Sequence, residues 1–98
     1  MAVMDIAVVP VGTSSPSISE HVAKAVLVAR ESGLEATVTA MGTVVTGEVG
    51  ELLALAGKMH KAVMSGKVVR CVTTIHIDDR TDKPMSAKSK VAAVEARL

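Results

Sequence analysis

Asp5 is the residue with the clearest potential for chemistry, because it interrupts an apolar segment, AVMDIAVVPV, at residues 2–11. The segment alternates as a β-strand does, and both of its faces are largely apolar, which predicts a central strand of a sheet. A carboxylate in such a strand is unfavourable unless it is paired or hydrogen-bonded. Two compatible interpretations follow. Asp5 forms a salt bridge to Arg70 or His76 on a neighbouring strand, or it binds a cationic or amine-bearing ligand.

A second group of candidate residues consists of threonines and one methionine near one end of the predicted sheet: Thr39, Met41, Thr43 and Thr74. Threonine is common in strands for reasons of packing alone, so the residue type is weak evidence of a site. Hydroxyl groups in an otherwise apolar cleft would nevertheless suit a small heterocyclic ligand. These residues are therefore candidates for ligand binding together with Asp5.

The loop GTSSPS at residues 12–17 lies just before a predicted helix, whose first amide groups can hold an anion. The loop has neither the lysine nor the spacing of a P-loop, and it has no G-x-S-x-G motif for a serine nucleophile. Ser17 and Glu20 have the spacing of a capping box, so a helix cap is the favoured interpretation.

The histidines and the cysteine predict no catalytic or metal site. His21, His60 and His76 are scattered over two helices and a strand, and with Cys71 they lack metal-ligand spacing. Cys71 is the only cysteine, which excludes an intramolecular disulfide, and we expect an inert thiol on the helix side of the sheet. No nucleophile, base and orienting group come together, so we expect no enzyme, no metal and no catalytic cofactor. A small isomerase or hydrolase is a minor alternative.

Periodicity and turn residues predict the elements that must position these side chains. Gly33 and Gly66 stand where C-terminal helix glycines belong. The predicted elements are a strand at 2–11, a helix at 17–32, a hairpin of strands at 34–40 and 43–47, a helix at 48–65, a strand at 67–78 and a terminal helix at 84–98.

The order β-α-β-β-α-β predicts a single α+β domain over residues 1–98, with a ferredoxin-like sandwich and an additional C-terminal helix. Right-handed crossovers place the first and third strands in the centre of the sheet and both main helices on one face. The other face is left bare. In so short a chain, we expect the terminal helix or another subunit to cover it.

The composition limits the partners. The 98 residues are 49% hydrophobic and include no Phe, Tyr or Trp, so the core must consist of aliphatic side chains and methionine. A formal net charge of +1 argues against a nucleic acid as the main partner, and there are no rings on which bases stack. The sequence has no signal peptide and no membrane span, which predicts a cytoplasmic protein.

Three segments together resemble one known family. They are VVPVGT followed by SIS after the first strand, TAMGTVVTG across the hairpin, and TTIHIDDR in the last strand. In order and spacing they are similar to the small thiamine-binding proteins, which are related to the YkoF-like hydroxymethylpyrimidine/thiamine-binding proteins. The resemblance covers nearly the whole chain. It implies a ferredoxin-like subunit in dimers or in tetramers made of two dimers, and no established catalysis.

The resemblance also implies a ligand, thiamine or its hydroxymethylpyrimidine precursor, bound on the open sheet face or at a subunit interface. A cationic thiazolium and an aminopyrimidine call for a carboxylate, hydroxyls and an apolar floor. The residues of those kinds on the predicted strand faces are Asp5, Thr39, Met41, Thr43 and Thr74, and a phosphorylated ligand would reach Thr13 and Ser17. The alternative is an oligomeric regulatory or structural module without a dedicated small ligand.

Overall fold

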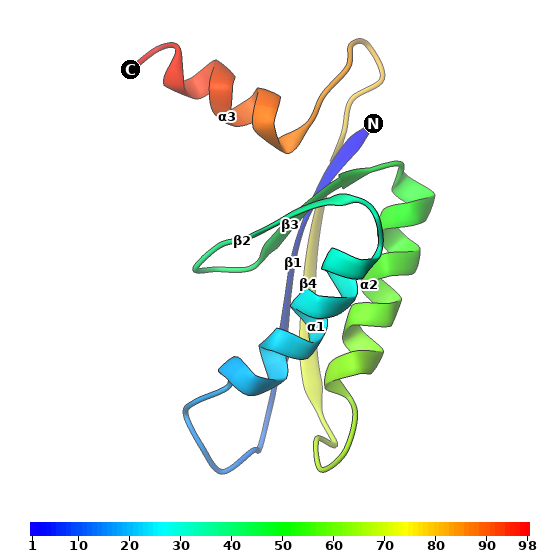
Figure 1. Cartoon of the computed structure of the whole chain (residues 1–98), viewed down its shortest axis with the longest axis vertical. Coiled ribbons are helices and arrows are strands. Elements are labelled where there is room, and N and C mark those ends of the chain that lie inside the picture. Colours follow the sequence, from blue (N-terminus) through cyan, green and yellow to red (C-terminus); the bar gives the residue numbers. More distant parts are fainter.

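The secondary-structure elements follow the predicted order, and the computed structural model describes all residues from 1 to 98 (Figure 1). The elements are β1 (Ala2–Pro10), α1 (Ser19–Glu31), β2 (Glu35–Val38), β3 (Thr43–Gly47), α2 (Val49–Val63), β4 (Cys71–Asp79) and α3 (Ala87–Glu95). The largest difference in bounds is at β4, which was predicted from residue 67 and begins at Cys71. It begins where the register with β1 begins, since Pro10 is the partner of Cys71.

The four strands form an antiparallel sheet in the order β2-β3-β1-β4, with β1 and β3 in the centre as predicted. Helices α1 and α2 pack on one face of this sheet and on each other (Figure 1). This is the ferredoxin-like arrangement that the element order predicted.

The alternation of β1 divides the two faces of the sheet. Met4 and Ile6 are fully buried under the helices, whereas Asp5 lies between them on the opposite face. From α2, Leu52 and Met59 complete the same core. As expected from the composition, the core contains only aliphatic side chains and methionine.

The central strands differ in length, which leaves a notch in the sheet. β3 pairs with β1 from Ala2↔Gly47 only as far as Ile6↔Thr43, whereas β4 accompanies β1 to Pro10. Residues 7–10 of β1 therefore have a partner strand on one side only. On the other side lies the tip of the β2–β3 hairpin.

Gly42 allows the hairpin tip to approach β1 closely. A Cβ atom on Gly42 would lie 2.8 Å from Asp5 Oδ1 and 2.8 Å from the Ile6 carbonyl oxygen. No real side chain tolerates such a contact with a backbone atom, so this position requires glycine for reasons of space.

The start of α1 differs from the prediction. Ile18, and not Ser17, is the N-cap residue, and no side chain caps the helix. The Ser17 amide instead donates to Ser15 Oγ at 3.1 Å, inside a loop in which Ser14 has a φ of 61°. Local side-chain-to-backbone bonds compete with capping, and here they displace the Ser17–Glu20 capping box.

Helix α3 covers only one end of the bare sheet face. Ser86 caps the helix by accepting from the Ser89 amide at 3.1 Å, and the Ala87 amide donates to Thr46 Oγ1 at 3.1 Å. Toward the other end of that face, Val9 and Val72 are exposed. Within one chain, the terminal helix therefore does not cover the whole face, which was the first of our two expectations for its cover.

We predict that Gly42→Ala destabilises the fold by about 1–3 kcal/mol, because the added methyl group must displace either the hairpin or β1. The free energy of unfolding is measured by urea denaturation. Gly57→Ala is the matched control, since Gly57 is an exposed helix position with no atom near its missing Cβ. The control should be stabilised by about 0.4–1 kcal/mol. An unchanged stability of Gly42→Ala would contradict the close approach.

Candidate functional site

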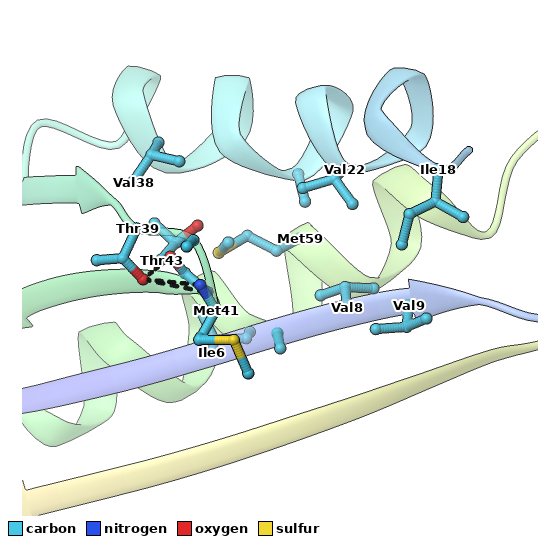
Figure 2. Close-up of a pocket in the computed structure, with 14 residues that line it drawn as sticks. Ile6, Val8, Val9, Ile18, Val22, Val38, Thr39, Met41, Thr43 and Met59 are labelled. Carbon is cyan, nitrogen blue, oxygen red and sulfur yellow. Dashed lines mark hydrogen bonds between the residues drawn. The ribbon is translucent and has the colours of Figure 1, made fainter. Parts of the chain in front are cut away.

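The notch beside β1 contains a cavity of about 180 Å³. Its walls are residues 6–9 of β1, the start of α1 and the hairpin tip from 38 to 43, with Met59 of α2 at the back (Figure 2). Eleven of the fourteen lining residues are hydrophobic, so shape and apolar contact dominate what the cavity can bind.

Thr39 holds the hairpin tip in place. Its hydroxyl accepts from the amides of Met41 and Gly42 at 3.2 and 3.1 Å and lies 2.9 Å from the Gly42 carbonyl, to which it donates. The Thr39 amide also donates to the Gly42 carbonyl at 2.8 Å. With these bonds made, the Thr39 side chain shapes the cavity wall and has little hydrogen-bonding capacity left for a ligand.

Thr43 is the polar side chain of the cavity that stays available. The residue is buried, it lines the cavity, and its hydroxyl makes no hydrogen bond to another side chain or to the backbone. A ligand in the cavity can therefore use this hydroxyl as donor or acceptor. Met41, in contrast, is 84% exposed, and in Figure 2 its side chain extends from the hairpin tip toward β1.

Asp5 stands on the open sheet face, next to the cavity but not in its lining. Its Oδ1 faces the Gly42 backbone, and its Oδ2 lies 4.0 Å from His76 Nδ1. These side chains are 46% and 79% exposed, so the ion pair is weak in water. Of the two predicted partners, His76 is therefore a distant neighbour and Arg70 makes no salt bridge. Much of the capacity of the carboxylate remains for a ligand.

The structure brings together part of the predicted residue set. Thr39, Met41 and Thr43 line the cavity, and Asp5 adjoins it through Gly42. The three others lie outside the lining. Thr13 Oγ1 donates to the Ser15 carbonyl at 3.1 Å, Ser17 is exposed in the same loop, and Thr74 is exposed on β4 opposite Ala7.

The walls contributed by Val8, Ile18 and Val22 were not among the predicted site residues. Ile18 and Val22 have the helical spacing of core residues, and the sequence gives no reason to separate them from the core. They line a cavity because β3 begins only at Thr43 and therefore does not pair with β1 beyond Ile6, which is a property of the strand register.

Cys71 and His60, which the sequence left unconnected, are in contact on the helix side of the sheet. Cys71 Sγ lies 3.4 Å from His60 Nδ1 and 3.8 Å from Nε2, while Nδ1 lies 2.6 Å from Thr73 Oγ1. Because sulfur is nearly equidistant from both ring nitrogens, it is not aligned with the lone pair of either one. The contact therefore lacks the geometry of a thiol–imidazole proton relay. The chain has no cluster of three or more metal-ligating side chains.

Arg80 and Asp82 form a solvent-exposed pair in the segment before α3. Arg80 Nε and Nη2 donate to the two carboxylate oxygens at 2.6 and 2.8 Å. These hydrogen bonds lower the pKa of Asp82 below its usual value and raise the pKa of Arg80. The pair lies apart from the cavity, and its geometry stabilises the local turn.

Comparison with solved structures agrees with this fold. A crystal structure of a hypothetical protein from Methanocaldococcus jannaschii superimposes with a TM-score of 0.89 at 32% identity, covering 96% of this chain and 95% of that one. A Thermotoga maritima protein, for which a role in thiamine biosynthesis or salvage has been suggested, gives a TM-score of 0.82 at 20% identity. It covers 95% of this chain and 97% of its own.

Sequence comparison identifies the family. A UPF0045 protein of Eremothecium gossypii is 40% identical over 95 residues, covering 97% of this chain and 90% of the relative. The UPF0045 protein YqgV of Bacillus subtilis is 33% identical over 102 residues, covering 100% and 98%. The family model described as thiamine-binding protein matches residues 4–95. The chain therefore belongs to the thiamine-binding protein family.

Proposed function

We propose that this protein binds thiamine or its hydroxymethylpyrimidine precursor without transforming it, and that the ligand enters the notch beside β1. The observation that carries the proposal is an apolar cavity in a member of the thiamine-binding family, with one free hydroxyl inside and a carboxylate at its edge. Ligand sites commonly combine apolar walls with a few polar groups that fix orientation.

The volume of the cavity favours one ring over two. Drug-sized ligands occupy sites of about 300–1,000 Å³, and this cavity measures about 180 Å³. An aminopyrimidine would fill it, and the thiazolium of thiamine would then remain outside. The Asp5 carboxylate lies against Gly42 at the edge of the cavity, so its negative charge would favour the cationic ring.

We also propose that the protein is not an enzyme and that thiamine acts as ligand and not as catalytic cofactor. Aliphatic side chains, Thr39 and Thr43 line the cavity, and none of these groups changes protonation near neutral pH. Neither Asp5 nor His76 belongs to the lining, so an acid–base pair at the ligand is not in place. A carrier, sensor or scavenger role would require binding alone.

The alternative function is an oligomeric regulatory or structural module, and the uncovered apolar surfaces favour it. Val91, Val94 and Leu98 are exposed on and after α3, beside a groove of about 940 Å³ between α3 and the segment before it. Exposed apolar surface of this kind commonly marks an interface. We therefore propose a homo-oligomer, a tetramer built from two dimers, for either function, and separately we propose a cytoplasmic location. None of the helices is long and apolar enough to span a membrane.

Assembly is tested by native mass spectrometry of freshly purified protein, which reports subunit number and any retained small molecule together. We expect tetramers, because the apolar stripe of α3 and the bare sheet face need cover. A stable monomer would contradict the assembly proposal. A tetramer that neither retains nor takes up a ligand would favour the structural module.

Binding is tested by isothermal titration with thiamine, hydroxymethylpyrimidine and thiamine phosphate. We expect saturable heat with thiamine and hydroxymethylpyrimidine. The Ser17 amide is already bonded to Ser15 Oγ, so an anion would need other amides of the loop at 12–17; if it binds there, thiamine phosphate should bind more tightly than thiamine. The absence of heat with all three compounds, on protein shown to be folded, would refute the proposed function.

Asp5→Asn should weaken thiamine binding by about 0.5–1 kcal/mol, because a half-exposed carboxylate contributes a solvent-screened attraction. Hydroxymethylpyrimidine is neutral, so its affinity should change little, and this contrast separates an electrostatic role from a loss of structure. Asp79→Asn, at an exposed carboxylate of β4, serves as the control variant and should leave both affinities unchanged. Equal losses for both ligands in Asp5→Asn would exclude the charge interaction.

A further inference from the structure

The direction of each peptide group of β1 can be derived from the strand register. In an antiparallel pair, the N–H and C=O groups of a residue point to the same side, and that side alternates along the strand. The Val11 amide donates to the Arg70 carbonyl at 2.8 Å, so the peptide groups of Val11 point toward β4. The peptide groups of Val9 then also point toward β4, and those of Ile6 and Val8 point away from it.

The hairpin supports the same assignment independently. The Thr39 amide donates to the Gly42 carbonyl. The peptide groups of even-numbered β3 residues therefore point toward β2, and those of odd-numbered residues point toward β1. Thr43 is thus the last β3 residue bonded to β1, and its partner is Ile6. The next β1 residue whose peptide groups point to this side is Val8, and no residue of β3 pairs with it.

Val8 therefore presents one main-chain donor and one main-chain acceptor to the notch. Neither group has a hydrogen-bond partner in the strand register or among the turn and loop bonds. Val8 is only 5% exposed and lines the cavity. Buried peptide groups are paired in the great majority of cases, so this donor–acceptor pair calls for a partner from outside the chain.

The short free edge does not suit a peptide strand. Strand addition needs a row of alternating donors and acceptors, but Pro10 has no N–H and Val9 is bonded to β4. The hairpin tip closes the other end of the notch at Gly42. The edge therefore suits an occupant that needs one donor and one acceptor, side by side and in the plane of the sheet.

We propose that the Val8 peptide groups recognise a planar heterocycle by an edge that carries a ring-nitrogen acceptor next to an amino donor. The ring nitrogen accepts from Val8 N–H, and the amino group donates to Val8 C=O. Val22 and Met41 supply apolar contacts, and the Thr43 hydroxyl is within the same cavity. This inference rests on the proposed function and specifies which half of thiamine enters the notch: the aminopyrimidine and not the thiazolium.

The test compares ligands that differ at this edge, by isothermal titration on the full-length protein. In oxythiamine an oxo group and a ring N–H replace the amino group and the ring nitrogen, so donor and acceptor are exchanged. Its affinity should be lower than that of thiamine on the order of 10- to 100-fold. The ring N–H of oxythiamine would face the Val8 N–H, and its oxo group would face the Val8 carbonyl. Hydroxymethylpyrimidine should retain binding without the thiazolium.

The outcomes separate this inference from the proposed function. Equal binding of oxythiamine and thiamine would overturn the edge recognition and leave a thiamine-binding function standing. No binding of any of these compounds would refute both. Val8→Ala keeps both peptide groups and should keep the preference for thiamine over oxythiamine. Met41→Ala should weaken the binding of both thiamine and oxythiamine, while the ratio of their affinities stays the same.

NMR locates the contact directly. On saturation with hydroxymethylpyrimidine, the Val8 amide proton should shift downfield and gain protection from hydrogen exchange, because it acquires an acceptor. The Val9 amide is the internal control, since the β4 pairing already satisfies it, and it should change little. A Val8 amide that stays unshifted while other cavity amides respond would overturn the proposal.

Discussion

The early end of the β1–β3 pairing is the constraint on which the candidate site depends. β3 separates from β1 after Thr43, while β1 continues for four more residues along β4. A gap in a central position of a sheet exposes peptide groups that a longer β3 would satisfy. It also leaves a space between α1 and the hairpin tip that side chains only partly fill. The hydrogen bonds of Thr39 hold the tight turn that forms the far side of this gap.

The absence of aromatic residues explains the character of the cavity. A flat ring often packs on aromatic side chains, and this chain contains no Phe, Tyr or Trp. Its walls are instead branched aliphatic side chains, with methionine at two positions, Met41 and Met59. Methionine is flexible and polarizable, so it adapts to a flat surface that rigid aliphatic groups contact poorly. Recognition then depends more on hydrogen-bonding edges than on stacking.

The sequence predicted the fold more completely than the site. The alternation of β1 and β4 and the helical spacing in α1 and α2 were sufficient for element order, sheet order and the buried face. The prediction was wrong at Ser17, because a local bond from its amide to Ser15 Oγ displaced the cap. Composition and strand faces selected Thr39, Met41 and Thr43, which line the cavity. They could not select Val8, whose relevance comes from its peptide groups and from the register of a strand elsewhere in the chain.

The proposed function and the edge recognition both require a ligand ring in the notch beside Val8. A crystal structure of the protein with bound hydroxymethylpyrimidine would show whether the ring lies there. We expect a pyrimidine in the plane of the sheet between β1 and the hairpin tip, hydrogen-bonded to the N–H and C=O of Val8. A ligand bound over the centre of the open sheet face, or in the groove beside α3 while the notch stays closed, would contradict it.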